Sequence, residues 1–334
     1  MPARRNRPGK VQRENRTFEV RGELRVRGRS YSVLEELGGQ HSPRLLLDDP
    51  VTRQLRVALI LPNQSSTAQH VQVLRRLPRT DELPQILDFD RQRDRTIIVL
   101  TWVRGIELGN YLQRVKAGRV VAPSPYEAVR LVRGLAHALH RLNKHAQIVH
   151  GDLKPQNLIL THHPSRLVMI DFGSAWPIEQ TLFRSEGDGL STVYAAPELQ
   201  QETPQLATLA DQFSATLILY QLITGEVPYS GLGGLAGRPG YADAFRDAYV
   251  PATELSESLR LLPRSISRAI DGLLAQGLQL DLADRYASTS AWLDAIEGVY
   301  LKLKIHERSD GKVITRWERF LNTLTDLLIR RWNS

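Results

Sequence analysis

HGDLKPQN at residues 150–157 is the most informative stretch of this sequence, and three further segments follow it in order. They are DFG at 171–173, AAPE at 195–198 and DQFSATLILYQLITGEVPY at 211–229. Each segment alone would be a weak signal. All four together, in this order and at these separations, leave little room for coincidence and indicate one known architecture.

With these segments the chain resembles the protein kinase family over roughly residues 31–297. The resemblance implies an α+β fold of two lobes, with a small antiparallel β lobe, a larger helical lobe and a cleft between them. It also implies ATP as the phosphate donor, Mg²⁺ or Mn²⁺ as the metal, and a protein as the substrate or regulated partner.

The residue types in HGDLKPQN and DFG suit phosphoryl transfer, which requires the γ-phosphate, the metal and the attacking hydroxyl to be held nearly in line. By resemblance, Asp152 orients or accepts the hydroxyl proton and Lys154 contacts the γ-phosphate. Asn157 and Asp171 supply the hard oxygen ligands that Mg²⁺ prefers. Lys154 two residues after Asp152 is typical of serine/threonine kinases. The purely structural alternative is that Asp152 and Asn157 cap a loop.

The resemblance also assigns residues to the nucleotide base. We expect Leu45, Ala58 and Ile159 above and below the adenine ring, and backbone groups of Thr101 and Val103 at its edge. The alternative interpretation is that these apolar residues simply belong to the core.

The usual ion pair of the β lobe is absent from the sequence. In VALI at residues 57–60, Ile60 takes the place of the lysine that grips the phosphates, and no lysine occurs from 11 to 115. Segment 63–79 contains no acidic residue, and His70 stands where the lysine's glutamate partner would be. Loss of both partners is physically coherent, because a buried glutamate without its cation would be costly.

The glycine-rich loop is also changed. Gly38 remains, but Gln40 and Pro43 replace the second and third glycines, and a proline has no N–H to offer a phosphate. Arg44 is our candidate for a replacement cation, since with-no-lysine kinases use a lysine from this loop region. The alternative is that Arg44 faces solvent from an exposed strand.

Other positions have expected structural roles. Glu198 should pair with Arg285, and Asp211 should hold the catalytic-loop backbone from a buried helix. Gly151 stands where the family usually has an arginine before the catalytic aspartate, so control by phosphorylation of the following segment is doubtful. Four hydroxyl residues of that segment remain candidates for modification, namely Thr181, Ser185, Ser191 and Thr192.

Two interpretations of function remain open. The first is an ATP-dependent serine/threonine kinase with attenuated activity, because losing one preorganised cation typically costs about a hundred- to a thousand-fold in rate. The second is a pseudokinase that regulates a partner through its shape or its terminal helix. A kinase-fold enzyme acting on a small molecule is a further possibility within the first interpretation.

Composition sets outer limits. The chain has 334 residues, of which 42% are hydrophobic and 24% are charged, so disorder throughout is excluded. It contains no cysteine, which rules out disulfides and thiolate catalysis. The longest apolar runs are too short to cross a bilayer, and the N-terminus lacks the apolar core of a secretory signal. We therefore expect a cytoplasmic protein.

The net charge of +8 is concentrated at the two ends. Six basic residues against one glutamate occur in residues 1–16, and eight against four acids occur in 299–334, so the middle carries about one negative charge. The body of the fold therefore has no excess charge that favours nucleic acid. The basic end is either a solvated tail or a weak attractor of phosphates and anionic lipid.

These patterns give a domain division. Residues 1–16 are expected to be a basic disordered tail, 17–103 the β lobe with one helix, 104–297 the helical lobe, and 298–334 an amphipathic helical extension. The extension could pack on its own domain, bind a partner protein or, less favourably, bind an anionic membrane surface. The spacing of apolar residues predicts helices over 66–77, from 125 onward, and over 208–224, 264–277 and 288–305.

Overall fold

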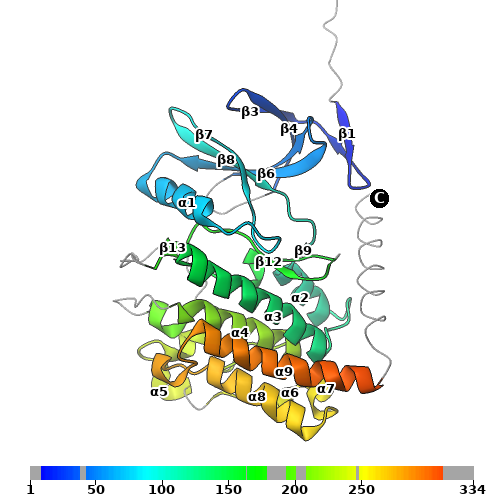
Figure 1. The fold of residues 1–334 in the computed structure, drawn as a ribbon, viewed down its shortest axis with the longest axis vertical. Helices are drawn as coiled ribbons and strands as arrows, with labels where there is room; N and C mark the ends of the chain where they lie inside the picture. The colour runs from blue at the N-terminus through cyan, green and yellow to red at the C-terminus, as the bar shows by residue number, and fades with distance from the viewer. Residues whose placement is uncertain are drawn as a thin grey trace, which may run out of the picture. The chain divides into compact units, whose positions relative to one another are not determined.

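The computed structural model describes residues 9–37, 43–162, 164–178, 193–200, 208–245 and 248–310 (Figure 1). The chain forms two compact units. Among the described residues, the first contains those up to Arg75 together with Pro84–Val103, and the second contains Arg76–Leu83 and those from Arg104 to Asp310. The first is rich in strands and the second in helices, so the predicted α+β class is confirmed.

The first unit consists of a hairpin, a six-stranded antiparallel sheet and one helix. The hairpin pairs β1 (Lys10–Arg13) with β2 (Arg16–Glu19). The helix is α1 (Ser65–Arg76). The sheet has the order β3-β4-β5-β6-β8-β7 and comprises β3 (Gly22–Val26), β4 (Arg29–Glu36), β5 (Arg44–Asp49), β6 (Gln54–Pro62), β7 (Ile86–Arg91) and β8 (Arg95–Thr101).

The hairpin corrects one prediction. Residues 10–13 were expected to lie in a disordered tail, but they form β1. The prediction was based on the basic composition of these residues. In the strand, Val11 packs against an apolar cluster while the charged residues beside it face outward or pair with acids. A basic composition therefore did not prevent a strand here.

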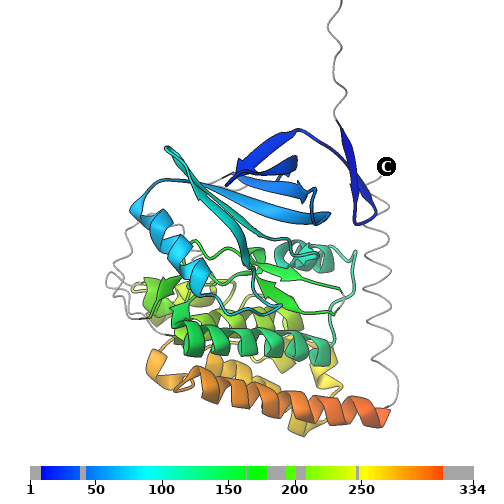
Figure 2. The ribbon, with the colours of Figure 1, turned by 45° about the horizontal axis from the view of Figure 1, so that its top comes forward.

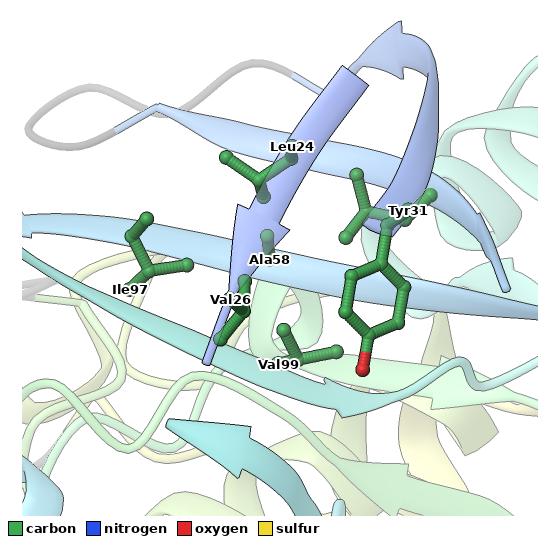
Figure 3. Close-up of a cluster of buried hydrophobic side chains, with 7 residues drawn as sticks. Leu24, Val26, Tyr31, Ala58, Ile97 and Val99 are labelled. Atoms are coloured by element: carbon green, nitrogen blue, oxygen red, sulfur yellow. The ribbon is translucent and has the colours of Figure 1, made fainter. Parts of the chain in front are cut away.

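One face of the sheet is closed by its own side chains. Leu24 and Val26 of β3 and Tyr31 of β4 gather with Leu47, Ala58, Ile97 and Val99 from the other strands (Figure 3). The Tyr31 hydroxyl reaches β7, where it donates to Asp88 Oδ2 at 3.3 Å. Strand β3 thus folds over this face and completes a small core within the first unit.

The opposite face carries a second cluster, to which the hairpin contributes. Phe18 of β2 packs with Leu34, Leu46 and Leu55, and Trp102 lies against the same group. Arg13 adds an ion pair to this contact, with Nε 2.6 Å from Asp48 Oδ1 and a terminal nitrogen 3.1 Å from Oδ2. The side chain of Asp48 is only 2% exposed, so Arg13 neutralises a buried charge.

The second unit is built on long helices, with short strands between them (Figure 2). Its α-helices are α2 (Leu108–Lys116), α3 (Pro125–Arg141), α4 (Leu209–Thr224), α5 (Ala242–Phe245), α6 (Ala252–Leu255), α7 (Glu257–Arg260), α8 (Arg264–Gly277) and α9 (Thr289–Asp310). Its strands are β9 (Ile106–Glu107), β10 (Ile148–Val149), β11 (Leu158–Leu160), β12 (Leu167–Met169) and β13 (Trp176–Pro177).

Local sequence explains where α3 and α4 begin and end. Ser124 caps α3 by accepting the Glu127 N–H at 3.2 Å, and Pro125 occupies the first turn, where its missing N–H costs nothing. Helix α4 ends at Gly225, which takes a left-handed φ of 79°. Nearly all its residues are buried, which is why it can hold functional groups rigidly in the interior.

Helix α9 runs along α3 in both ribbon views (Figures 1 and 2). Glu297 Oε1 lies 2.7 Å from both Arg133 Nε and His137 Nε2 of α3, and Tyr300 stacks on Tyr126. Burial alone would raise the pKa of Glu297, but these two hydrogen bonds lower it below its ordinary value. Glu297 therefore binds α3 as a carboxylate.

Helix α9 continues to Asp310, five residues beyond its predicted end at 305. The predicted domain boundary at residue 297 consequently falls inside a helix. The amphipathic extension predicted beyond it lies largely outside the described residues, which end at 310. In the part of the chain that is described, no helix combines the length and hydropathy needed to cross a membrane.

The hairpin contact yields a test of stability. Replacing Arg13 by Ala leaves the buried Asp48 carboxylate without its cation, so Arg13→Ala should lower the free energy of unfolding by about 2 kcal/mol, measured by urea denaturation. Arg25→Ala is the matched control, because Arg25 is 76% exposed and water screens its pair with Glu23, so its loss should leave the free energy of unfolding almost unchanged. Equal losses in the two variants would contradict this account.

Candidate active site

The segment His150–Asn157 connects β10 to β11 in the second unit, and α4 holds it from beneath. Asp211, in the first turn of α4, is 1% exposed and accepts two backbone hydrogen bonds. The N–H of His150 donates to its Oδ2 and the N–H of Gly151 donates to its Oδ1, both at 2.8 Å. The predicted role of Asp211 is confirmed.

Three predicted residues meet within this segment. Lys154 Nζ lies 2.7 Å from Asp152 Oδ2, and the Asn157 amide nitrogen donates to the same oxygen at 3.0 Å. The Asn157 amide also donates to the backbone oxygen of Asp152 at 2.8 Å. The short 3₁₀ turn Pro155–Asn157 brings Asn157 back toward Asp152, so one carboxylate, one cation and one amide share a site.

Asp171 lies at the same end of the β11–β12 hairpin as Asn157. Leu158 pairs with Met169, and the next hydrogen bond of the ladder runs from the Ile170 N–H to the Asn157 oxygen at 2.9 Å. Asp171 follows directly. Its φ of 65° is unusual for a residue with a side chain, and such strain persists only where the surroundings hold it.

The next residue, Phe172, anchors Asp171 from the interior. Its ring lies 4.8 Å from the imidazole of His150, and both side chains are buried. The two motifs HGDLKPQN and DFG are therefore joined by packing as well as by the β11–β12 ladder.

The donors at this site fit a magnesium ion that is shared with phosphates. Both N–H groups of the Asn157 amide point toward Asp152, and no described residue donates to its oxygen. Asp171 adds a carboxylate close by. Among the described residues, no three His, Asp or Glu side chains form a metal cluster. Mg²⁺ usually takes one or two protein carboxylates and completes its shell with phosphates and water, so Asn157 and Asp171 match its usual protein donors.

Ala58, one of the residues predicted to contact the base, lies in the core that β3 closes. Its side chain is 0% exposed within the core that β3 closes, and Val99 opposite it is equally enclosed (Figure 3). Leu45, which pairs directly with Ala58, packs against the same core.

The other face carries the neighbouring residues, one position away. Leu46 pairs with Val57 and Val57 pairs with Leu100, so these three side chains lie on one face. The sequence does not distinguish the two faces here, because RLLL and VALI are apolar at consecutive positions, and alternation identifies a face only where the two faces differ. Leu46 itself is covered by the cluster that contains Phe18.

The phosphate-gripping region follows the same register. Arg44 pairs with Leu59, and both share the face of Leu46 and Val57, whereas Ile60 pairs with Ile97 on the closed side. Ile60, which stands at the lysine's place in the sequence, thus shares the face of Ala58, and Arg44 lies on the opposite face. His70 of α1 is buried, and α1 has no acid in its sequence. Gly38 lies outside the described residues.

The remaining base-binding candidates belong to different units. Thr101 ends β8, and its N–H is already used by the Gln85 oxygen at 3.0 Å, so only its carbonyl could meet a ligand. Val103 follows at the end of the first unit. Ile159 is in the middle of β11 in the second unit, where it pairs with Val168 and Glu107.

Trp176 is a residue that the sequence argument missed. Gly151 has a left-handed φ of 70°, and a Cβ placed on it would overlap the indole of Trp176. Trp176 is 1% exposed and pairs with Val149 through the β10–β13 ladder. The only sequence signal was the glycine itself, at a position where the resemblance predicts arginine.

Glu198 and Arg285 form the predicted pair. Two terminal nitrogens of Arg285 lie 2.8 and 2.9 Å from the two carboxylate oxygens of Glu198, and both side chains are buried. The guanidinium also sits 4.7 Å above the ring of Phe213 in α4. The predicted phosphorylation candidates Thr181, Ser185, Ser191 and Thr192 lie outside the described residues.

Comparison with known proteins agrees with this geometry. The family model described as the protein kinase domain matches residues 55–295. The serine/threonine-protein kinase PrkC of Bacillus subtilis is 26% identical over 217 residues, covering 62% of this chain and 32% of PrkC. The serine/threonine-protein kinase pkn3 of Myxococcus xanthus is 28% identical over 230 residues, covering 64% of this chain and 38% of pkn3.

Among solved structures, the kinase PK-1 of the Cydia pomonella granulovirus aligns with a TM-score of 0.65 at 18% identity, covering 79% of this chain and 93% of PK-1. At that identity the likeness concerns the fold alone. The matched segment spans about a third of the length of each bacterial relative, so the activities of those whole proteins do not transfer directly.

The Asp211 contact can be tested by a minimal change. Asp211→Asn keeps the shape but offers one acceptor oxygen for two N–H donors, so a buried N–H loses its partner. The free energy of unfolding should fall by about 1–3 kcal/mol in urea denaturation. Asp284→Asn, an exposed control on the same unit, should change it by less than about 0.5 kcal/mol. A neutral Asp211→Asn would mean that the two bonds contribute nothing.

Proposed function

Since the chain belongs to the protein kinase family, we propose that it transfers the γ-phosphate of ATP to serine or threonine hydroxyls of a protein. The observation that carries the proposal is that Lys154 and Asn157 both donate to Oδ2 of Asp152, and that Asp171 lies at the end of the adjoining hairpin. The serine/threonine class is supported by Lys154 and by the two bacterial relatives.

Each side chain then has a task. Asp152 orients the acceptor hydroxyl and takes its proton, while Lys154, held 2.7 Å away, offers positive charge to the transferring phosphate. Asn157 and Asp171 are the protein ligands of Mg²⁺, which, when bound, neutralises charge on the phosphates. The hydrogen bonds that Asp211 accepts from the backbone before Asp152 hold this loop in place while charge shifts between these groups.

The first unit contributes a weaker phosphate grip. Arg44 is the proposed replacement cation, because it begins β5 directly after the segment that aligns with the glycine-rich loop. A guanidinium is bulkier and planar, and it does not reproduce the point charge of lysine. Activity should therefore be attenuated relative to kinases that keep the lysine–glutamate pair.

A pseudokinase is the second candidate, and the absence of any lysine between residues 11 and 115 favours it. In that case the same carboxylates would bind a nucleotide weakly or not at all, and the protein would act by contact with a regulated partner. Binding and turnover therefore need separate tests.

For nucleotide binding, the measurement is thermal unfolding with and without ATP and Mg²⁺. At ligand concentrations near a hundred times Kd, the Tm should rise by about 5 °C or more. Asp171→Ala should abolish the rise, Arg44→Ala should reduce it, and Asp284→Asn should retain it. A parent protein whose Tm does not respond to Mg-ATP would refute nucleotide binding.

For turnover, the measurement is transfer of labelled γ-phosphate to generic protein substrates and to the chain itself. Asp152→Asn should reduce the rate by about a hundred-fold or more while it retains the Mg-ATP shift in Tm. Binding without any transfer, under Mg²⁺ and Mn²⁺ alike, would favour the pseudokinase.

A further inference from the structure

The contact between Gly151 and Trp176 joins the catalytic loop to the chain beyond DFG. Gly151 immediately precedes Asp152, and its N–H is one of the two that Asp211 binds. On its other side, the indole of Trp176 occupies the space where a side chain of residue 151 would project. The peptide before Asp152 is thus held between a buried carboxylate and a buried ring.

Trp176 is itself fixed by its surroundings. The β10–β13 ladder pairs it with Val149, two residues before Gly151, and its side chain is 1% exposed. It also follows Asp171 by only five residues, so it belongs to the segment that carries the metal-binding aspartate. Because the ring is fixed in this way, the peptide of Gly151 packed against it has little room to move, and Asp152 follows that peptide directly.

We infer that Trp176 is a positioning residue for Asp152: its indole packs on Gly151 and holds the catalytic loop without any charge at position 151. This inference rests on the proposed function for its kinetic consequence. It also implies that the loop carrying Asp152 is ordered without phosphorylation of the segment after DFG, because Gly151 offers no cation that a phosphate could bind.

The decisive variant is Trp176→Ala, with Trp176→Phe as the conservative partner. Removing the indole frees the peptide of Gly151, so kcat per folded molecule should fall about ten- to a hundred-fold, while KM for ATP and the Mg-ATP shift in Tm stay within two-fold of the parent. Trp176→Phe should recover most of the kcat. Trp292→Ala is the matched control, because Trp292 is equally buried but lies in α9.

The reverse change gives an independent variant should Trp176→Ala fail to fold. Gly151→Ala adds a single methyl group against the ring and should lower kcat in the same way, and the double variant Gly151→Ala/Trp176→Phe should regain part of it. A kcat within two-fold of the parent in both Trp176→Ala and Gly151→Ala would overturn the inference. So would an equal loss of kcat in Trp292→Ala.

A second readout keeps this inference separate from the proposed function. Hydrogen exchange at the amides of His150 and Gly151 should accelerate about ten-fold or more in Trp176→Ala and not in Trp292→Ala. If the parent shows no phosphotransfer, the proposed function fails, but the exchange result still decides whether Trp176 holds the loop. Unchanged exchange would overturn that role.

The last test asks whether activity depends on phosphorylation. Phosphatase-treated protein, and a variant with Thr181, Ser185, Ser191 and Thr192 all changed to Ala, should keep kcat within two-fold of the untreated parent. A loss of ten-fold or more in both, with full recovery after phosphorylation of the parent, would show that the indole is insufficient on its own.

Discussion

The carboxylate of Asp211 is the constraint on which the candidate site depends. It lies in a helix that is buried almost all round, and it binds two consecutive N–H groups of the loop that carries Asp152. A buried charge of this kind is costly unless it is satisfied, so the loop and the helix stabilise each other. The conformation of the loop is therefore tied to the core of the second unit rather than to the ligand.

Buried charges in the described residues follow one rule. The buried carboxylates Asp48, Asp49, Glu127 and Glu198 each bind an arginine, while Asp211 binds backbone N–H groups. The first unit is consistent with this rule, because the expected lysine and its glutamate partner are both missing. Removing one alone would have left an unpaired charge, which typically destabilises a protein by several kcal/mol.

The second unit could be predicted from the sequence more fully than the first, and the reason is physical. HGDLKPQN and DFG contain polar residues whose chemistry and spacing are specific, so the motifs alone were enough to place Asp152, Lys154 and Asn157 together and to pair Glu198 with Arg285. Two central strands of the first unit, β6 and β8, carry apolar residues at consecutive positions and so on both faces. Consecutive apolar residues, as in VALI, leave the facing of each side chain ambiguous, so the sequence alone could not place Ala58 in the core that β3 closes.

Residues that act through shape rather than charge were the hardest to predict. Trp176 has no motif of its own, and only the missing side chain at Gly151 hints that something fills that space. The two positions form one unit of packing, since a side chain at 151 and an indole at 176 cannot coexist in this backbone. The loop before Asp152 is held by apolar packing at position 151, and the first unit has Ile60 and His70 where the resemblance predicts an ion pair. In the first unit the cation and the anion of that pair are absent together, so neither is left buried without its partner.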